Sequence, residues 1–161
     1  MAINEIKFFR GKYSFLSNFY PCAIIHEGYE YRNLEAAFQA AKCGNLSDRI
    51  QFQCLEPAKA KKLGREIILR NDWEDKKLFI LQELVRLKFI SNPDLLNCLL
   101  ETDDAMLTEN NMWHDNFYGN CVCSRCQNIT GLNHLGIILM QLRNQLLHNI
   151  KCLNENKNKQ Y

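Results

Sequence analysis

The chain has 161 residues, of which 47% are hydrophobic, and its formal net charge is +2. This length and composition favour one compact domain with its own core, and the small, scattered positive charge argues against broad, charge-driven binding of nucleic acid. No apolar run approaches the roughly 20 residues that a membrane span needs, so we expect no membrane association.

The N-terminal residues and the cysteines bear on the cellular compartment. Residues 1–5 contain no basic region followed by an apolar one, as a signal peptide would. We therefore expect a cytoplasmic protein. In that compartment its eight cysteines are free thiols or metal ligands rather than disulfides.

The first third of the chain predicts a hairpin that leads into a helix. Residues 6–10 predict a short strand, and residues 13–21 a loop with aromatic anchors. Residues 22–26 and 29–31 predict two strands that turn at Glu27-Gly28. Asn33 is a favourable N-cap for the helix that follows over residues 34–42. The apolar side chains of this helix have helical spacing: Leu34, Ala37, Phe38 and Ala41.

This opening helix is apolar nearly all round, which is typical of a buried helix. Its polar side chains form one narrow arc, made of Glu35, Gln39 and Lys42. From the residues alone the arc is either a solvated strip with an i, i+4 hydrogen bond or the polar wall of an internal site.

Further helices are predicted along the rest of the chain. They cover residues 46–54, 57–62 with closure at Gly64, a long segment capped by Asp72, a segment that begins at Pro93, and a final helix capped by Asn133. Residues 106–109 predict a short strand. Arg65 and Arg143 lie where a helix dipole favours cations, although Arg65 could instead hold an anion. From Asn154 onward the polar composition predicts disorder, and no domain boundary interrupts residues 1–153.

Residues 110–130 form a long connection without periodicity, and such loops are usually functional. Three cysteines lie in its second half with the spacing C-x-C-x-x-C, and a histidine precedes them: His114, Cys121, Cys123 and Cys126. Three thiolates and one imidazole could make a tetrahedral zinc site. Only one C-x-x-C pair is present, so free thiols are the favoured interpretation, and we expect no cofactor to be required.

Carboxylates are the candidate catalytic groups. Glu35 lies on the opening helix, and Glu109 and Asp115 flank the aromatic loop. Carboxylates among aromatic side chains suit cleavage of a glycosidic bond, because an anion stabilises the cation-like sugar C1 or activates water. Aromatic rings stack on a base, and Lys or Arg can bind a phosphate. Composition alone does not select this chemistry.

Several segments, in their order along the chain, carry a family resemblance. They are residues 9–11 (Phe-Arg-Gly), 15–21 (Phe-Leu-Ser-Asn-Phe-Tyr-Pro), 31–42, 60–65 (Ala-Lys-Lys-Leu-Gly-Arg), Asp72-Trp73, Lys88-Phe89, 107–110 (Leu-Thr-Glu-Asn), Asp115 with Tyr118-Gly119, and 131–143 with Gly131, Asn133, Gly136 and Arg143. Together they resemble the NADAR/YbiA-like family from Phe8 to about Leu146.

The resemblance implies an α+β, mainly helical fold, a single domain with a small N-terminal hairpin packed on helices. It also implies an N-glycosidase acting on a small ribosyl or ADP-ribosyl substrate. The expected substrates are phosphorylated, ribosylated pyrimidines of riboflavin synthesis, or guanine that carries ADP-ribose, including in nucleic acid. Many relatives have Trp where this chain has Tyr118, and YbiA-type proteins lack the cysteine cluster, so the reaction class follows more directly than the substrate.

The family's functional positions fall on particular residues of this chain. Its carboxylates fall on Glu35, Asp115 and Glu109, and with them in mind we favour the reading in which the Glu35 arc faces the active site. Glu35 or Asp115 would stabilise the developing cation or orient water, and the other would help the base leave. Further residues are expected to contact substrate: Arg10, Lys42 and Arg65 at the phosphate, Phe19, Trp73, Trp113 and Tyr118 as stacking walls, and Asn18, Gln39, Gly119 and Asn133.

Two other functions remain open from the sequence. A non-catalytic ADP-ribose-binding module would use the same residues without turnover. A zinc-stabilised interaction domain would use the cysteine cluster instead.

Overall fold

The computed structural model describes residues 4–158 of the chain. The fold is α+β and mainly helical, as the resemblance implied. The chain forms two compact units, which are described separately. We call Arg10–Leu95 the hairpin unit, and Met1–Phe9 with Leu96–Tyr161 the loop unit.

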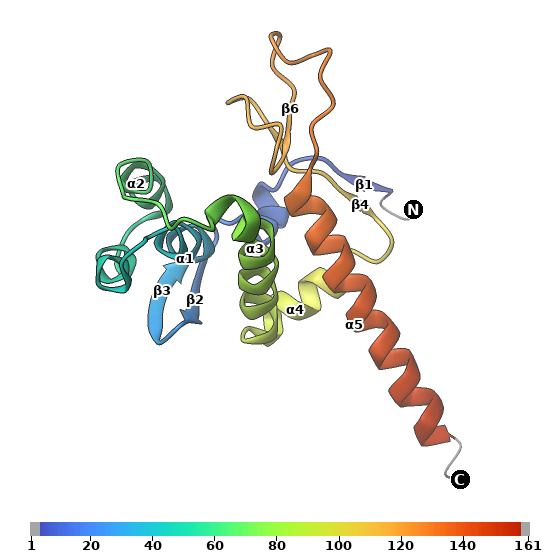
Figure 1. The fold of residues 1–161 in the computed structure, drawn as a ribbon. Helices are drawn as coiled ribbons and strands as arrows, with labels where there is room; N and C mark the ends of the chain where they lie inside the picture. The colour runs from blue at the N-terminus through green and yellow to red at the C-terminus, as the bar shows by residue number, and fades with distance from the viewer. Residues whose placement is uncertain (1–3, 159–161) are drawn as a thin grey trace. The chain divides into compact units, whose positions relative to one another are not determined.

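The hairpin unit begins with η1 (Gly11–Leu16), a 3-10 helix where the sequence predicted a loop. The predicted hairpin is confirmed: β2 (Pro21–His26) and β3 (Tyr29–Asn33) are antiparallel, with Ile24 opposite Tyr31. Both strands contact the next helix, and β2 also contacts α3 (Trp73–Ile90). Figure 1 shows the hairpin beside these helices.

Helix α1 (Leu34–Ala41) is at the centre of the hairpin unit. The side chain of Asn33 accepts a 2.8 Å hydrogen bond from the backbone N–H of Ala36, which confirms the predicted N-cap. All eight residues of α1 are buried, since β2, β3, η2, α2 and α3 all contact it. Its alanines allow these elements to approach closely on every side.

Two short helices follow α1 in the sequence. Residues expected to form the second helix form η2 (Leu46–Phe52), which is 3-10 rather than α. Helix α2 (Pro57–Leu63) starts with Pro57 in its first turn and ends at Gly64, as predicted. Asp72 precedes α3 but makes no side-chain cap, because its carboxylate pairs with the guanidinium of Arg70, with an Nη2–Oδ2 distance of 3.0 Å.

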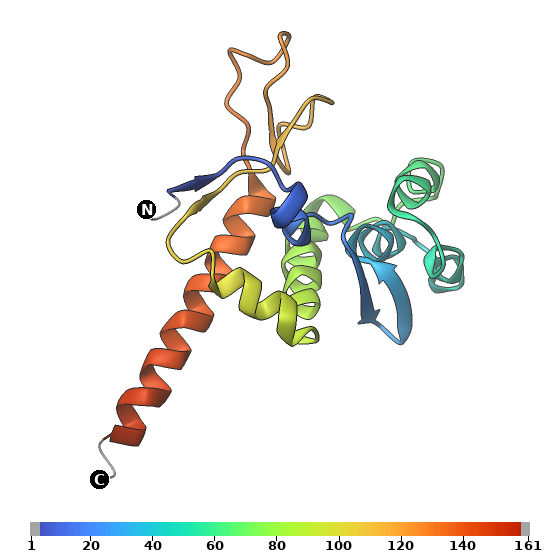
Figure 2. The same ribbon diagram turned by 180° about the vertical axis from the view of Figure 1, so that it is seen from behind.

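The loop unit has short strands and one long helix. Strand β1 (Glu5–Ile6) pairs in parallel with β4 (Met106–Leu107). Both strands are shorter than the sequence predicted. Strands β5 (Asn110–Asn111) and β6 (Asn120–Cys121) form a second parallel pair inside the segment expected to be an irregular loop. Figure 2 shows β1 and β4 side by side. Helix α4 (Pro93–Leu100) begins at Pro93, but of its four leucines only Leu99 is buried.

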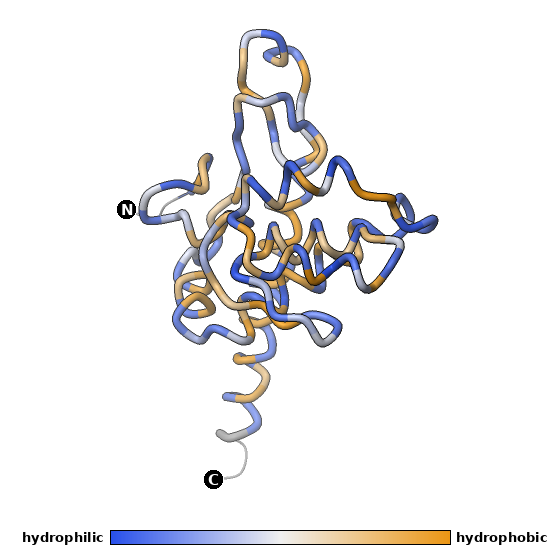
Figure 3. The backbone as a smooth tube through the Cα atoms, turned by 90° about the vertical axis from the view of Figure 1, so that its left-hand side faces the viewer, coloured by the Kyte–Doolittle hydropathy of each residue, from blue (hydrophilic) through white to orange (hydrophobic). Residues whose placement is uncertain are grey.

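Helix α5 (His134–Asn158) follows Asn133. Arg143 does not serve as a partner of the helix end; it is 2% exposed and its Nη1 donates to the Thr102 hydroxyl at 2.8 Å and to the Ala105 carbonyl at 2.9 Å. The helix extends to Asn158, whereas we expected disorder from Asn154, and residues 159–161 lie outside the described part. Near the C-terminus hydrophilic and hydrophobic residues alternate along it (Figure 3). Within residues 4–158, no helix is long and apolar enough to cross a bilayer.

Candidate functional site

The predicted site residues fall into two groups, one in each unit. The first group is built around Glu35 on α1, whose side chain is only 5% exposed. Its Oε1 accepts a 2.7 Å hydrogen bond from the Nε2 of Gln39, which is 3% exposed. The backbone N–H of Glu35 donates to the carbonyl of Asn18 at 3.0 Å. Glu35 and Gln39, two of the three side chains in the arc, are thus buried. The interpretation of the arc as a solvated strip is therefore wrong.

Lys42 completes the arc at the end of α1. Its ammonium lies 5.7 Å from the centroid of the Phe38 ring and 5.6 Å from that of Trp73, and the two rings are 5.2 Å apart. Burial lowers the pKa of Lys42, and the nearby Glu35 carboxylate opposes that effect. Trp73 is buried, so in this structure it packs against Phe38 and Lys42 rather than presenting an open face.

Two further cations lie near Lys42, one on α2 and one just after it. Lys61 and Arg65 both act on Lys42 electrostatically and lower its pKa further. The ammonium of Lys61 also lies 5.8 Å from the ring centroid of Phe19, which is 43% exposed. Lys61 was missed by sequence reasoning, because nothing in its local pattern distinguishes it from Lys59 and Lys62 on the same helix.

The backbone of Gly64 lies directly against the side chain of Gln39, the partner of Glu35. A Cβ atom at this position would overlap the Oε1 of Gln39 and lie 2.7 Å from its Cδ. The missing side chain of Gly64 therefore leaves room for the Gln39 amide. That Oε1 is buried and has no hydrogen-bond partner among the described residues, and the same holds for the Oδ1 of Asn18. Arg10, the remaining predicted residue of this unit, is exposed at the start of η1.

The second group lies in the loop unit, around Asp115. Its Oδ1 accepts backbone hydrogen bonds from Phe117 at 3.1 Å and from Tyr118 at 2.9 Å. The Asp115 carboxylate thus shapes the turn that carries the aromatic pair. The rings of Phe117 and Tyr118 meet edge to face at 4.8 Å. Trp113, two residues before Asp115, is 54% exposed.

Glu109 and Gly119 lie together in this group. The carbonyl of Glu109 accepts from the backbone N–H of Asn120 at 2.9 Å. A Cβ at Gly119 would overlap that same carbonyl and lie 3.4 Å from the Glu109 carboxylate. The side chain of Asn133 also bonds this backbone: its Oδ1 accepts from Glu109 N at 3.0 Å and its Nδ2 donates to Leu107 O at 2.9 Å. The amide of Asn133 is thus engaged by the backbone next to Glu109.

Asparagine side chains organise the long loop, a feature that the sequence did not reveal. Asn111 is 1% exposed; its Nδ2 donates to Asp115 O at 2.7 Å and its Oδ1 accepts from Trp113 N. Asn116 accepts from Cys121 N at 2.8 Å, and Asn120 accepts from Gly131 N at 2.8 Å. These amides replace the backbone pairing that a regular strand or helix would supply.

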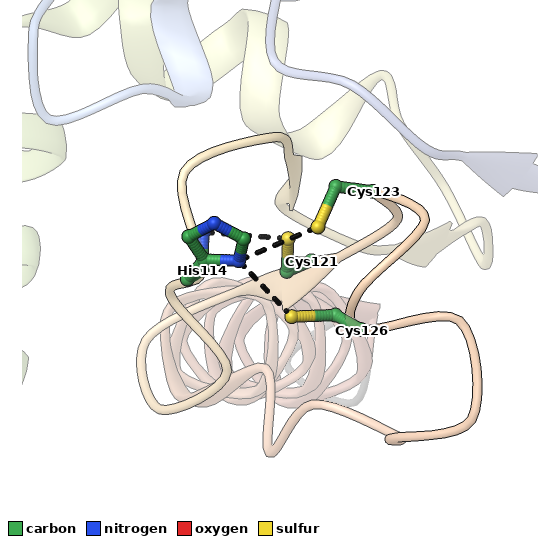
Figure 4. A group of neighbouring side chains, drawn as sticks. All are labelled: His114, Cys121, Cys123 and Cys126. Atoms are coloured by element: carbon green, nitrogen blue, oxygen red, sulfur yellow. Dashed lines mark hydrogen bonds between the residues drawn. The ribbon is translucent and has the colours of Figure 1, made fainter.

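The four residues with zinc-ligand spacing also come together in the loop unit (Figure 4). The side-chain nitrogen of His114 and the sulfur atoms of Cys121, Cys123 and Cys126 all lie within 4.8 Å of one another. All eight cysteines are free thiols. The group has the composition and the spacing to hold a metal ion.

Comparison with known proteins identifies relatives over most of this chain. The family model described as the NADAR domain matches residues 7–147. A riboflavin biosynthesis protein of Vibrio vulnificus is 34% identical over 143 residues, which cover 83% of this chain but 36% of the Vibrio protein. An N-glycosidase of Nostoc punctiforme is 34% identical over 140 residues, covering 83% of this chain and 86% of that protein.

The Escherichia coli N-glycosidase YbiA is 33% identical over 141 residues, which cover 83% of this chain and 82% of YbiA. Its NMR structure matches this fold with a TM-score of 0.78 and covers 92% of this chain and 88% of that chain, at 30% identity.

Proposed function

Because the chain belongs to the NADAR domain family, we propose that it is an N-glycosidase that hydrolyses the bond between a ribose phosphate and a base. Two relatives that this chain covers over most of their length are named N-glycosidases, and the Vibrio relative is named a riboflavin biosynthesis protein. The proposed substrates are therefore phosphorylated, ribosylated pyrimidines, with ADP-ribosylated guanine, free or in nucleic acid, as the second substrate class.

The observation that carries the proposal is the buried carboxylate of Glu35. As the C1–N bond lengthens, positive charge develops at the sugar C1 and its ring oxygen. A carboxylate held in a site with little water stabilises this charge far more than a solvated one would. Gln39 holds Glu35 in one orientation by donating to its Oε1 at 2.7 Å, so the anion need not reorganise during the reaction.

Hydrolysis replaces the C1–N bond of the substrate with a C1–O bond. The electron pair of the C1–N bond leaves with the base nitrogen, and the oxygen of water forms the new bond to C1. One proton of that water is lost and one proton reaches the base. Glu35 is proposed to stabilise the cation or orient the water. Asp115 and Glu109 are the other carboxylates of the predicted site, and either is a candidate to assist departure of the base.

The cations near Glu35 suit the phosphate of such a substrate. Lys61 and Arg65 each lie close enough to Lys42 to act on it electrostatically. Three neighbouring cations repel one another, and a bound phosphate dianion would relieve that repulsion while accepting charge-assisted hydrogen bonds. The unpartnered Oδ1 of Asn18 offers an acceptor for a ribose hydroxyl.

A substrate panel tests this proposal. Purified protein is incubated with ribosylated pyrimidine phosphates and with ADP-ribosylated guanine, and release of free base is followed by chromatography. We expect one class to be turned over and Glu35→Gln to reduce turnover by about 10²–10⁴-fold with an unchanged melting temperature. The control Glu30→Gln alters an exposed carboxylate on β3 and should leave turnover unchanged. Tight binding of ADP-ribose without release of base from any substrate would favour the non-catalytic binding module instead.

The phosphate site has its own test. Lys61→Met and Arg65→Met should raise KM for the phosphorylated substrate more than for its dephosphorylated form, with little change in kcat. Lys59→Met removes an exposed cation from the same helix and serves as the control. Equal effects on both substrates would place the phosphate elsewhere.

A further inference from the structure

The cluster of His114, Cys121, Cys123 and Cys126 lies outside the chemistry proposed above. We propose that it is a structural zinc site that closes the loop between β5 and β6. The three thiols are 1%, 9% and 6% exposed in chain order, whereas the His114 side chain lies at the surface. The site is therefore sealed on its sulfur side and reached from solvent beside the imidazole.

The distances suit tetrahedral zinc. With Zn–S bonds of about 2.3 Å and Zn–N of about 2.0–2.1 Å, tetrahedral ligand atoms lie roughly 3.5–3.8 Å apart. The Nδ1 of His114 is 3.3 Å from the sulfur of Cys123 and 3.3 Å from that of Cys126, and all four ligand atoms lie within 4.8 Å of one another. Figure 4 shows the imidazole nitrogen pointing at the space that the sulfur atoms surround.

A disulfide would not account for the gathering of all four side chains. One bond between two of the sulfur atoms would leave the third thiol and the imidazole without a role. Three soft thiolates with one imidazole, and no oxygen ligand in the set, are typical of a closed structural zinc site rather than of magnesium or calcium. All four ligand positions are filled by the protein, so no open position is left for catalysis.

The surrounding backbone supports thiolates at this place. The N–H of His114 donates to the sulfur of Cys121 at 3.3 Å, which stabilises negative charge on that sulfur. The N–H of Cys126 bonds the carbonyl of Cys123 at 3.0 Å, so the two ligands are joined by a tight turn. His114 has a φ of +66°, a conformation that a histidine rarely adopts and that a ligand bond would hold in place.

The positions of the ligands in the sequence indicate that the metal would order the loop over residues 115–120. His114 lies between Trp113 and Asp115, and Cys121 follows Gly119 and Asn120 directly. The loop that carries these predicted site residues is thus tied at both ends to one ion. Among the described residues this segment has only two-residue strands, so a metal crosslink would supply order that secondary structure does not.

The test measures metal rather than turnover, so its outcome is independent of the proposed N-glycosidase activity. The full chain is purified under reducing conditions from cells grown without added zinc, and its metal content is determined by mass spectrometry. We expect one zinc ion per chain. Cys123→Ser and Cys126→Ser should lose most of it, while Cys54→Ser, which alters an exposed cysteine of the hairpin unit, should retain it.

A second experiment covers the case in which those variants fail to fold. Zinc is extracted from the wild type with a chelator and replaced by Co²⁺. We expect thiolate charge-transfer bands and the strong visible bands of tetrahedral cobalt, and His114→Cys should preserve them while shifting their energy. Amide exchange of residues 110–130 should accelerate after extraction, with α1 unchanged.

Two outcomes would overturn the proposal. One is a wild type that holds no more zinc than Cys126→Ser and gives no thiolate–cobalt bands. The other is amide exchange in residues 110–130 that is the same with and without metal, since a loop-closing ion must slow it.

Discussion

Gln39 donates a 2.7 Å hydrogen bond from its Nε2 to the Oε1 of Glu35, one helical turn earlier on α1. Both side chains are at least 95% buried. A buried carboxylate is costly unless polar groups surround it, so this bond both stabilises the anion and fixes its direction.

Loss of the Gln39 amide should therefore reduce catalysis as well as stability. Hydrogen bonds to charged groups contribute about 1.5–3 kcal/mol, which corresponds to roughly 10–150-fold in rate if the bond acts mainly in the transition state. We expect Gln39→Leu, which keeps the approximate volume, to lower kcat by that factor in the base-release assay. Gln82→Leu, an exposed change on α3, is the matched control. A wild-type kcat in Gln39→Leu would remove this bond from the mechanism.

Gly64 should be as sensitive as Gln39, although it carries no functional group. An alanine Cβ would overlap the Gln39 amide oxygen, and the amide must then move away from Glu35. We expect Gly64→Ala to reduce turnover by about tenfold to a hundredfold, because a displacement of about 1 Å can cost that much.

Gly44→Ala is the control for this change, since its nearest neighbours would be 3.5 Å from the new Cβ. Equal activity in the two alanine variants would show that the Gln39 side chain adapts.

Asp115 allows its structural and chemical contributions to be separated. Its Oδ1 accepts two backbone N–H bonds, and an asparagine carbonyl can accept both. We expect Asp115→Asn to keep the melting temperature but lose turnover. Asp115→Ala should lose turnover and also about 0.5–2 kcal/mol of stability, as loss of a capping side chain does.

Asp94→Asn, at an exposed position on α4, controls for the charge change. Full turnover in Asp115→Asn would make this residue a positioning group for Phe117 and Tyr118 rather than a catalytic one.

His26 should make the stability of the chain depend on pH. Burial lowers its pKa, Glu83 opposes that effect from 3.7 Å, and Arg49 and Arg70 add to the lowering. Between this lowered folded-state pKa and the unfolded value of about 6.5, the unfolded chain binds more protons than the folded chain. The free energy of unfolding must therefore fall as the pH falls through that window.

The measurement compares urea unfolding at about pH 7 and about pH 5, on either side of the unfolded pKa. We expect a smaller loss of stability on acidification in His26→Gln than in the wild type. His148→Gln replaces an exposed histidine and should behave as the wild type does. An identical pH dependence in His26→Gln and the wild type would exclude His26 as the cause.

Local sequence patterns determined much of the hairpin unit. The Glu27-Gly28 turn, the Asn33 cap and the burial of α1 followed from residue types a few positions apart, because backbone preferences and helical periodicity act over that range. The family segments indicated the fold class, and the apolar periodicity of residues 34–42 placed Glu35 on a buried helix.

The tertiary structure decided what distant polar groups bind. Arg143 bonds Thr102 and Ala105 instead of its own helix end. The approach of Lys61 to Lys42 and the meeting of His114 with three cysteines are of the same kind. Each depends on how buried donors, acceptors and charges find partners once the chain is packed, and no periodicity in the sequence encodes that choice.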